Sequence, residues 1–389
     1  MSLLVNFNCV YCLQKLSFGL ELLHFYIFLQ LIMDSRNLNK DGETCIHGTC
    51  LDMCPPQEMN LRKREKLVHK LEVTTEGYKL VKCYSRSAAD SNMAVPSQLR
   101  PFPTLMATTQ YLLLNVSKRK DVKMSVIYNF LDDRLRSVRQ DMTIQRLQPE
   151  ECVKLLEPMI RFYCYYSYRL CEYPLREFDP VLNKKYLLEC MKWFLACCDA
   201  LEKTDLESMT DILKDLNLSK DNILSCDRTL VESLYVLCNL SDIHPLYRYL
   251  SLPNHLKRSK LKLAYEIAVA NMLGNYVRVW RLAEQLCPLT FAALCLYLPT
   301  MQKRGLRVIS SAYNSKRLNV PTKVIQQWLG FNSEEEVRVM CAYYGQTATD
   351  VVCFNNALFK SDAEVPQPKQ HHMARISRLA LGDVMFYTI

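Results

Sequence analysis

Apolar residues recur every three or four positions through most of the middle of the chain. The clearest example lies between residues 125 and 147, where one face carries Ile127, Phe130, Leu131, Leu135, Val138 and Met142. This spacing predicts an amphipathic helix. Similar patterns follow from residue 150 to about residue 313, with short breaks and no strict repeat period. Because such helices cannot bury their apolar faces alone, we expect them to stack as an irregular helical-repeat solenoid.

The stretch before the solenoid, residues 48–149, has a different pattern. Proline is favoured in the first turn of a helix, so Pro55 predicts a helix start, and the helical pattern extends from Glu58 to Glu72. Residues 74–104 are irregular and interrupted by several prolines. We expect them to form an extended segment that lies across the helices that follow.

The C-terminal part changes character after residue 313. A short helix enters through Pro321, and a second begins at Ser333, where Glu336 completes a capping-box pattern. Residues 348–360 are then rich in β-branched and aromatic residues around Asn355-Asn356, which indicates a hairpin there. Helix, turn, helix and hairpin together predict a winged helix over residues 314–361, followed by a polar tail over residues 362–389. The fold class predicted is therefore an all-α solenoid with a C-terminal winged helix.

Composition supports helices and a reducing compartment. The 389 residues include only nine glycines, which sheet-rich folds use freely, and eighteen cysteines, several of them on apolar helical faces where a free thiol acts as a small hydrophobe. Residues 1–47 are predicted to be disordered or a spurious leader. Their longest uncharged run, Leu22–Ile32, falls short of the roughly 20 residues that span a bilayer. We expect residues 1–32 to be a gene-model extension with Met33 as the start; a membrane anchor is the alternative.

The net charge of +9 is concentrated in basic runs. Near the winged helix, six cations occur with no acidic residue among them: Lys303, Arg304, Arg307, Lys316, Arg317 and Lys323. They fit nucleic acid or an acidic protein subunit. A second group, Arg134, Arg136 and Arg139, is preceded by Arg62, Lys63 and Arg64. We expect this group to attach the N-terminal segment to the solenoid, so that charge reversal lowers stability.

The stretch "CIHGTCLDMCPP" places Cys45, His47, Cys50 and Cys54 within ten residues. Zinc ligands usually come as two pairs separated by a folded loop, and redox pairs are separated by two residues. A tight turn that leads into a helix, with the thiols packed inward, is the interpretation we favour.

Chemical motifs point away from catalysis. The sequence has no Gly-rich phosphate loop, no H-E-x-x-H and no G-x-S-x-G. Asp132, Asp133 and Asp141 alternate with arginines, which favours ion pairs over a general acid–base pair. We expect no catalytic residue, no cofactor and no metal.

Five motifs resemble, in order, those of the Sac/GANP family: "GTCLDMCPPQEMNLRKR" from Gly48, "VKCYSRSAAD" from Val81, "LRPFPTL" from Leu99, "FLDDRLRSVRQDMTIQ" from Phe130 and "GNYVRVWRL" from Gly274. They cover roughly residues 48–360. The positions that the resemblance marks are Cys50, Asp52, Met53, Cys54, Pro55, Tyr84, Arg86, Arg100, Pro101, Asp133, Arg134, Arg136, Arg139, Gln140, Asp141, Gly274, Asn275 and Tyr276.

The resemblance implies a PCI-type architecture, in which stacked helix pairs are capped by a winged helix. It also implies pairing with a second PCI protein and a small acidic subunit, and nucleic-acid contact through a basic winged-helix surface. We expect the chain to be similar to the short members, without the long Phe-Gly-repeat and centrin-binding regions of the large ones. We therefore expect a non-enzymatic scaffold in centrosome duplication, the spindle and mitotic progression. A scaffold of messenger-RNA export and nuclear RNA processing is the alternative. We expect the protein to be located in the cytoplasm in association with the centrosome or spindle, or in the nucleus, and we expect it not to contact a membrane.

Overall fold

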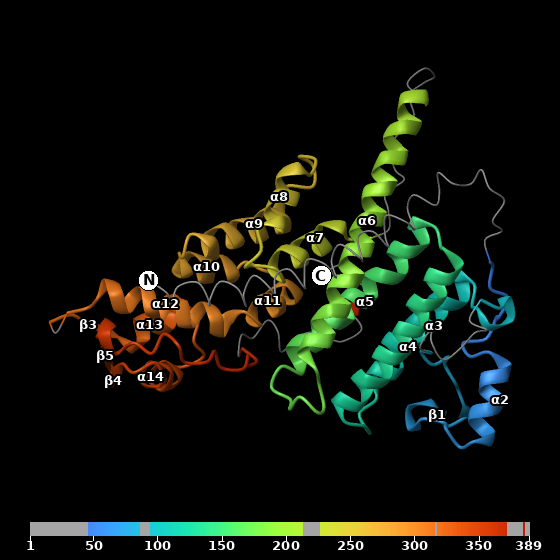
Figure 1. Cartoon of the computed structure of the whole chain (residues 1–389), viewed down its shortest axis with the longest axis horizontal. Coiled ribbons are helices and arrows are strands. Elements are labelled where there is room, and N and C mark those ends of the chain that lie inside the picture. The colour runs from blue at the N-terminus through green and yellow to red at the C-terminus, as the bar shows by residue number, and fades with distance from the viewer. Residues whose placement is uncertain (1–45, 86–93, 213–225, 316, 372–383, 386–389) are drawn as a thin grey trace, which may run out of the picture.

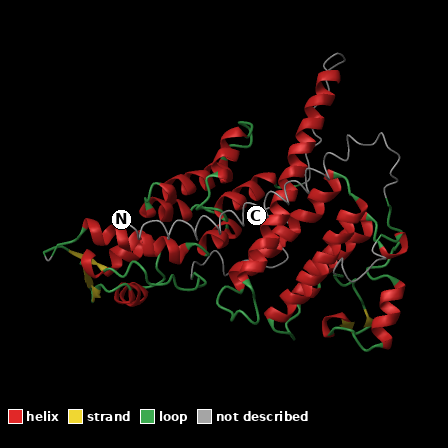
Figure 2. Ribbon diagram, viewed as in Figure 1, coloured by secondary structure: helices red, strands yellow, loops and turns green. Residues whose placement is uncertain are grey.

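The described chain is mainly helical, with short strands near its two ends (Figure 2). A computed structural model describes residues 46–85, 94–212, 226–315, 317–371 and 384–385. Within these ranges no helix is both long and apolar enough to cross a membrane. The predicted leader, including Met33, lies almost entirely outside the described residues.

The helices before the winged helix follow one another in the predicted order. They are α2 (Pro56–Arg64), α3 (Phe102–Leu114), α4 (Met124–Gln145), α5 (Pro149–Arg169), α6 (Pro180–Ile212), α7 (Arg228–Leu237), α8 (His244–Ser251), α9 (Ser259–Met272), α10 (Tyr276–Ala283), α11 (Pro288–Cys295) and α12 (Leu298–Ala312). Helix α5 packs on α6 and α11, and α9 packs on both α7 and α10. The elements α2–α6 lie at one end of the elongated molecule and the C-terminal elements at the other (Figure 1). This arrangement confirms the predicted helical solenoid.

Two separate hydrophobic clusters hold the described chain together. The larger contains residues from Leu71 to Met301, together with Val384 and Met385. It includes the apolar face predicted for α4, whose Leu131, Leu135 and Val138 are fully buried. The smaller extends from Leu306 to Phe359. Helix α12 contributes to both clusters and so connects the solenoid to the C-terminal part.

The C-terminal part has the order of a winged helix: α12, β3 (Asn319–Pro321), α13 (Thr322–Leu329), α14 (Glu334–Tyr343), β4 (Thr347–Ala348) and β5 (Val351–Cys353). The strands form an antiparallel sheet in the order β3-β5-β4. The centre of the sheet is the buried Val352, which pairs with Val320 on one side and Ala348 on the other. This order confirms the winged helix with its small hairpin.

The predicted position of the hairpin turn is wrong. The turn between β4 and β5 lies at Thr349-Asp350, because Val351 and Val352 are already paired in the sheet. The Asn355-Asn356 pair instead begins a short 3-10 helix, η4 (Asn356–Leu358). The Asn355 side chain accepts a hydrogen bond from the Ala357 backbone N–H (3.1 Å), so asparagine here is a cap and not a hairpin turn.

Helix α2 is shorter than the sequence indicates. It ends at Arg64, and Lys66 then adopts φ +56°, so the chain turns back. A 3-10 turn, η1 (Lys70–Glu72), follows and leads into the hairpin β1 (Val73–Thr74) and β2 (Gly77–Tyr78). Leu67 and Leu71 have helical spacing in the sequence but do not belong to α2. The reversal of the chain brings Glu72 close to Arg62, and the two side chains form an ion pair.

The segment after the winged helix packs on the solenoid, whereas the sequence indicates a polar tail. Gln367 Nε2 donates to the Cys171 carbonyl (2.7 Å), and the His371 N–H donates to the Tyr168 hydroxyl (2.9 Å). Val384 and Met385 are fully buried in the larger hydrophobic cluster. The polar residues of this segment satisfy backbone groups at the C-terminal end of α5, a role that periodicity does not reveal.

Candidate interaction surface

The cysteine-proline turn, residues 48–56, delivers the chain to α2. Cys50 and Cys54 are buried, and the Cys50 thiol donates to the Asp52 carbonyl (3.3 Å), while the Asp52 side chain is exposed. The Cys50 N–H donates to the Leu99 carbonyl (3.0 Å). Pro55 is the N-cap residue of α2. The thiols face inward, as the turn interpretation requires.

The four clustered Cys and His residues do not converge in the described part of the turn. Cys45 lies outside the described residues, and His47 is exposed while Cys50 and Cys54 are buried. Burial raises the pKa of both of these thiols. Within the described residues, no three His, Cys, Asp or Glu side chains are placed so that together they could hold a metal ion.

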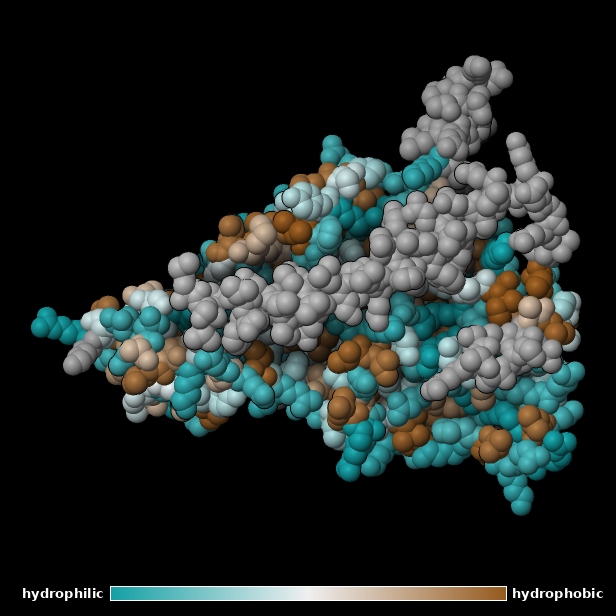
Figure 3. Space-filling model, viewed as in Figure 1, coloured by the Kyte–Doolittle hydropathy of each residue, from teal (hydrophilic) through white to brown (hydrophobic). Residues whose placement is uncertain are grey.

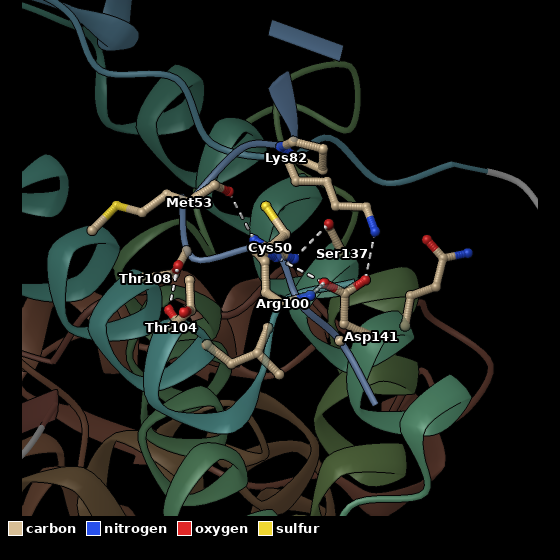
Figure 4. A network of polar contacts seen from close by, with 12 residues as sticks. Cys50, Met53, Lys82, Arg100, Thr104, Thr108, Ser137 and Asp141 are labelled. Carbon is tan, nitrogen blue, oxygen red and sulfur yellow. Dashed lines mark hydrogen bonds and ion pairs between the residues drawn. The ribbon is translucent and has the colours of Figure 1, made fainter. Parts of the chain in front are cut away.

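A buried ionic network joins the N-terminal segment to α4 (Figure 4). Asp141 accepts hydrogen bonds from Arg100 Nε (2.7 Å) and from Lys82 Nζ (2.7 Å). Arg100 also donates to the Ser137 hydroxyl (2.9 Å) and to the Met53 carbonyl (3.2 Å). The side chains of Arg100 and Asp141 are completely buried. The motif residues Met53, Arg100 and Asp141, far apart in sequence, thus form one structural unit.

Lys82 and Ser137 of this network were not among the predicted site residues. Both lie inside stretches that resemble family motifs, but lysine and serine are common on surfaces, so nothing in their local pattern indicates burial. Pro101, which follows Arg100, is the N-cap residue of α3 and fixes where this helix begins.

A second network lies beside the first. Arg134 on α4 is ion-paired with Glu72 (3.3 Å) and with Asp133. Arg62 on α2 is ion-paired with the same Glu72 and donates to the Val81 carbonyl (3.0 Å). Glu72 is almost completely buried between two arginines and was also missed by sequence reasoning. These contacts join α2, η1 and α4.

The other two predicted arginines on α4 face different partners. The Arg136 guanidinium lies 3.9 Å from the ring centre of Tyr84 and 4.8 Å from that of Tyr186, so it lies between two aromatic rings. Such contacts contribute about 0.5–2 kcal/mol. Arg139 pairs with Glu189 on α6 (3.3 Å). The three arginines therefore connect α4 to the N-terminal segment on one side and to α6 on the other.

Backbone contacts extend this attachment. The Tyr84 N–H donates to the Asp133 carboxylate (3.3 Å), and Gln140 Nε2 donates to the Ser85 carbonyl (2.7 Å). Arg86, the next residue of the motif, lies outside the described residues.

The expectation of ion pairs is wrong for Asp132. In the described chain this carboxylate forms no ion pair with an arginine and accepts a hydrogen bond from the Tyr163 hydroxyl (2.8 Å). Burial raises the pKa of Asp132, and the Tyr163 hydrogen bond opposes that rise. Asp133 and Asp141 are ion-paired as expected.

The Gly274-Asn275-Tyr276 motif turns the chain from α9 into α10. Gly274 adopts φ +71°, which glycine accepts without steric cost. The Asn275 side chain caps α10 by accepting from the Arg278 N–H (3.0 Å). Tyr276 is partly buried against both hydrophobic clusters. This turn therefore positions the winged helix relative to the solenoid.

The predicted basic surface is largely exposed. Arg304, Arg307, Arg317 and Lys323 are exposed, and none of the four pairs with a carboxylate of the described chain. Lys303 is half-buried and donates to the Ala363 carbonyl (2.5 Å), so it serves the packing of the C-terminal segment. Lys316 lies outside the described residues. We call the four exposed cations the basic patch.

Helix α14 has the opposite charge. It occupies the recognition-helix position of the winged helix, and in helix-turn-helix proteins the N-terminal residues of that helix contact base edges. Here these residues are Glu334, Glu335 and Glu336. Val339 and Tyr343 on the same helix are 56% and 44% exposed. Three carboxylates would repel phosphates, whereas exposed apolar side chains suit a protein partner.

The fold and these contacts define a class of protein: a helical-repeat scaffold capped by a winged helix, with an N-terminal segment attached to the solenoid by buried ion pairs. Residues 53–350, more than half of the chain, match the model of the SAC3/GANP family. The chain belongs to the SAC3/GANP family.

Individual relatives are consistent with this assignment. The chain is 27% identical over 361 residues to "Protein xmas" of Drosophila melanogaster, an alignment that covers 87% of this chain and 16% of that protein. It is 28% identical to "SAC3 family protein B" of Arabidopsis thaliana, covering 79% of the chain and 18% of that protein. For "SAC3 family protein 1" of Schizosaccharomyces pombe the identity is 24%, covering 78% and 30%. The alignments thus cover less than a third of each of these relatives.

Proposed function

We propose that this chain is a non-enzymatic protein-interaction scaffold that acts in centrosome duplication, the spindle and mitotic progression. Its partners would be a second PCI protein and a small acidic subunit. The observation that supports protein docking is the surface of α14, where Val339 and Tyr343 are exposed next to three glutamates. The mitotic role rests on the family membership, and the imaging experiment below tests it.

The proposed partner surface can be tested by two substitutions on α14. Val339→Asp replaces an exposed side chain, whereas Tyr343→Asp also removes a hydrogen bond from its hydroxyl to the Glu364 carbonyl (3.2 Å), so circular dichroism melting of both variants accompanies the test. Leu175→Asp is a matched control, because Leu175 is 71% exposed and lies in the loop between α5 and α6. Tagged full chains are purified from dividing cells and their partners are identified by mass spectrometry. A PCI protein recovered with the wild type and the control, but lost with both α14 variants, supports the proposal.

Imaging of the tagged protein through the cell cycle tests the process. Signal at spindle poles, together with centrosome-number defects after depletion, is expected. Signal confined to the nucleus, with retained polyadenylated RNA there after depletion, would refute the mitotic role and favour the alternative.

The alternative, a messenger-RNA export and nuclear RNA-processing scaffold, is supported by the basic patch. Four exposed cations that form no ion pair with a carboxylate of the described chain can contact phosphates, and each contact adds to the salt dependence of binding. Anisotropy titration with single-stranded RNA at low and moderate salt tests this directly. Binding that weakens steeply with salt and is lost in the Arg304→Glu, Arg307→Glu double variant would favour the alternative. Equal binding by the double variant would exclude the patch as the RNA site.

A further inference from the structure

A surface pocket of about 150 Å³ lies between α9 and α10, and no residue of α14 or of the basic patch lines it. One wall consists of Tyr265, Val269 and Leu273, spaced four residues apart, so they lie along one face of α9 and just beyond its end. The polar lining consists of Glu266 on α9, together with Asn275 and Arg278 at the start of α10. The pocket is thus an apolar groove along α9 with a polar edge.

Apolar side chains at and beside this pocket are exposed to solvent. Leu273, which lines the pocket, is 74% exposed, and its chain neighbour Met272 is 59% exposed. In Figure 3 a run of hydrophobic surface lies in the region where Figure 1 draws α9 and α10. Exposed apolar groups gathered around a groove mark interaction sites more often than isolated exposed leucines do.

The polar edge carries a net positive charge. Arg278 and Lys262, 60% and 63% exposed, both reach toward Glu266, at 4.0 and 3.9 Å. Exposed ion pairs at such distances contribute little. Two cations share one carboxylate, so the edge can receive a further carboxylate from outside.

We propose that this pocket docks an acidic amphipathic helix of a partner protein. An apolar side chain of that helix enters between Val269 and Leu273, and a second covers Met272. A carboxylate one helical turn away reaches Arg278 and Lys262. Apolar pockets of about 150 Å³ hold a benzene-sized group, which fits one leucine or phenylalanine side chain. Helices recognised in this way present anchors three and four residues apart.

The proposal goes beyond the function proposed above, because it uses no residue of α14 or of the basic patch. The probe is a short fluorescein-labelled synthetic peptide with leucines at every third and fourth position and glutamates elsewhere, titrated into the full chain. Saturable binding is expected, with no binding of the same peptide carrying alanines in place of leucines. Leu273→Asp should weaken binding by about tenfold, equal to about 1.4 kcal/mol. Leu175→Asp, at a residue 71% exposed, should leave it unchanged.

A charge exchange tests the carboxylate contact. Arg278→Glu should weaken binding of the glutamate peptide, and a lysine version of the peptide should bind this variant better than it binds the wild type. Arg176→Glu, at another exposed arginine, is the matched control. Circular dichroism melting of every variant establishes that it is folded.

Three outcomes would overturn the proposal. The first is no saturable binding to folded wild type, and the second is equal loss in Leu273→Asp and Leu175→Asp. The third is concentration-dependent dimerisation of the full chain that Leu273→Asp abolishes, since the occupant would then be a second copy of the chain.

Discussion

Replacing Asp141 with asparagine removes one negative charge from the buried network on α4. The carboxylate accepts from Arg100 Nε and Lys82 Nζ, each at 2.7 Å. Asparagine keeps the shape and one acceptor oxygen, but it leaves the completely buried Arg100 guanidinium without a counter-charge. Removing one partner of a buried ion pair typically costs about 3–5 kcal/mol. Because whole domains are stable by only about 5–15 kcal/mol, the loss should be large.

The loss should also be local. Lys82, Arg100 and Met53, the groups that meet around Asp141, belong to the segments that lead into α2 and α3. In Asp141→Asn, the backbone amides of residues 46–85 should therefore exchange with deuterium faster than in the wild type, while those of α14 should not change. Hydrogen–deuterium exchange with mass spectrometry resolves the two regions in one experiment, and urea unfolding gives the overall change.

Asp132→Asn is the matched control on the same helix. Burial raises the pKa of Asp132, so the folded state favours its neutral form. The neutral Asp132 carboxyl group stabilises the folded protein fully at pH values below its pKa in the unfolded chain, near 3.9. This stabilisation is lost as the pH rises through its pKa in the folded protein. At neutral pH the asparagine should therefore be as stable as the aspartate or more so. Unchanged exchange of residues 46–85 in Asp141→Asn, or equal destabilisation by the two variants, would refute the reasoning.

The remaining predictions concern single side chains of the N-terminal segment and α4. Arg134→Glu places a second carboxylate against the buried Glu72 and should lower the thermal midpoint; loss of a partner at unchanged stability would show that Arg134 is not an attachment point. Burial, and then Arg134, lowers the pKa of His69, whose Nδ1 accepts a backbone hydrogen bond. Neutral His69 stabilises the folded protein fully at pH values above its pKa in the unfolded chain, near 6.5, and this stabilisation is lost as the pH falls through its pKa in the folded protein. In His69→Asn, hydrogen exchange of residues 70–72 should therefore depend less on acid pH. Burial raises the pKa of Cys83 to about 12, so iodoacetamide should label the exposed Cys353 faster than Cys83 in the native protein, and equal rates would contradict this.

The local sequence pattern was sufficient to predict the helices. It also predicted those helix ends that depend on residues at the end itself. Gly274-Asn275 turns the chain from α9 into α10, because a positive φ and a side-chain cap are properties of those residues. Ser333 caps α14 by accepting from the Glu336 N–H (3.1 Å). The Glu336 carboxylate accepts from the Asn332 N–H (2.7 Å) and not from Ser333, so the capping box is shifted by one residue.

The local sequence pattern gave wrong predictions where contacts with residues distant in sequence decide the local conformation. Leu67 and Leu71 continue the helical spacing of α2, yet the chain turns at Lys66, and Glu72 thereby reaches Arg62. The asparagines at 355 and 356 favour a turn of some kind, but sheet pairing at Val352 places the hairpin turn earlier. In both cases a tertiary contact overrides a weak local preference.

The sequence by itself determined the helical class, the order of the elements, the winged helix and the family. Periodicity and motifs carry this information because each helix must bury one face wherever it is placed. Only the tertiary structure decided that Arg100 pairs with Asp141, that Glu72 lies between two arginines, and that α9 and α10 leave an apolar pocket between them. The physical reason is that charge partners and grooves arise where segments distant in sequence meet, and one-dimensional spacing says nothing about which segments those are.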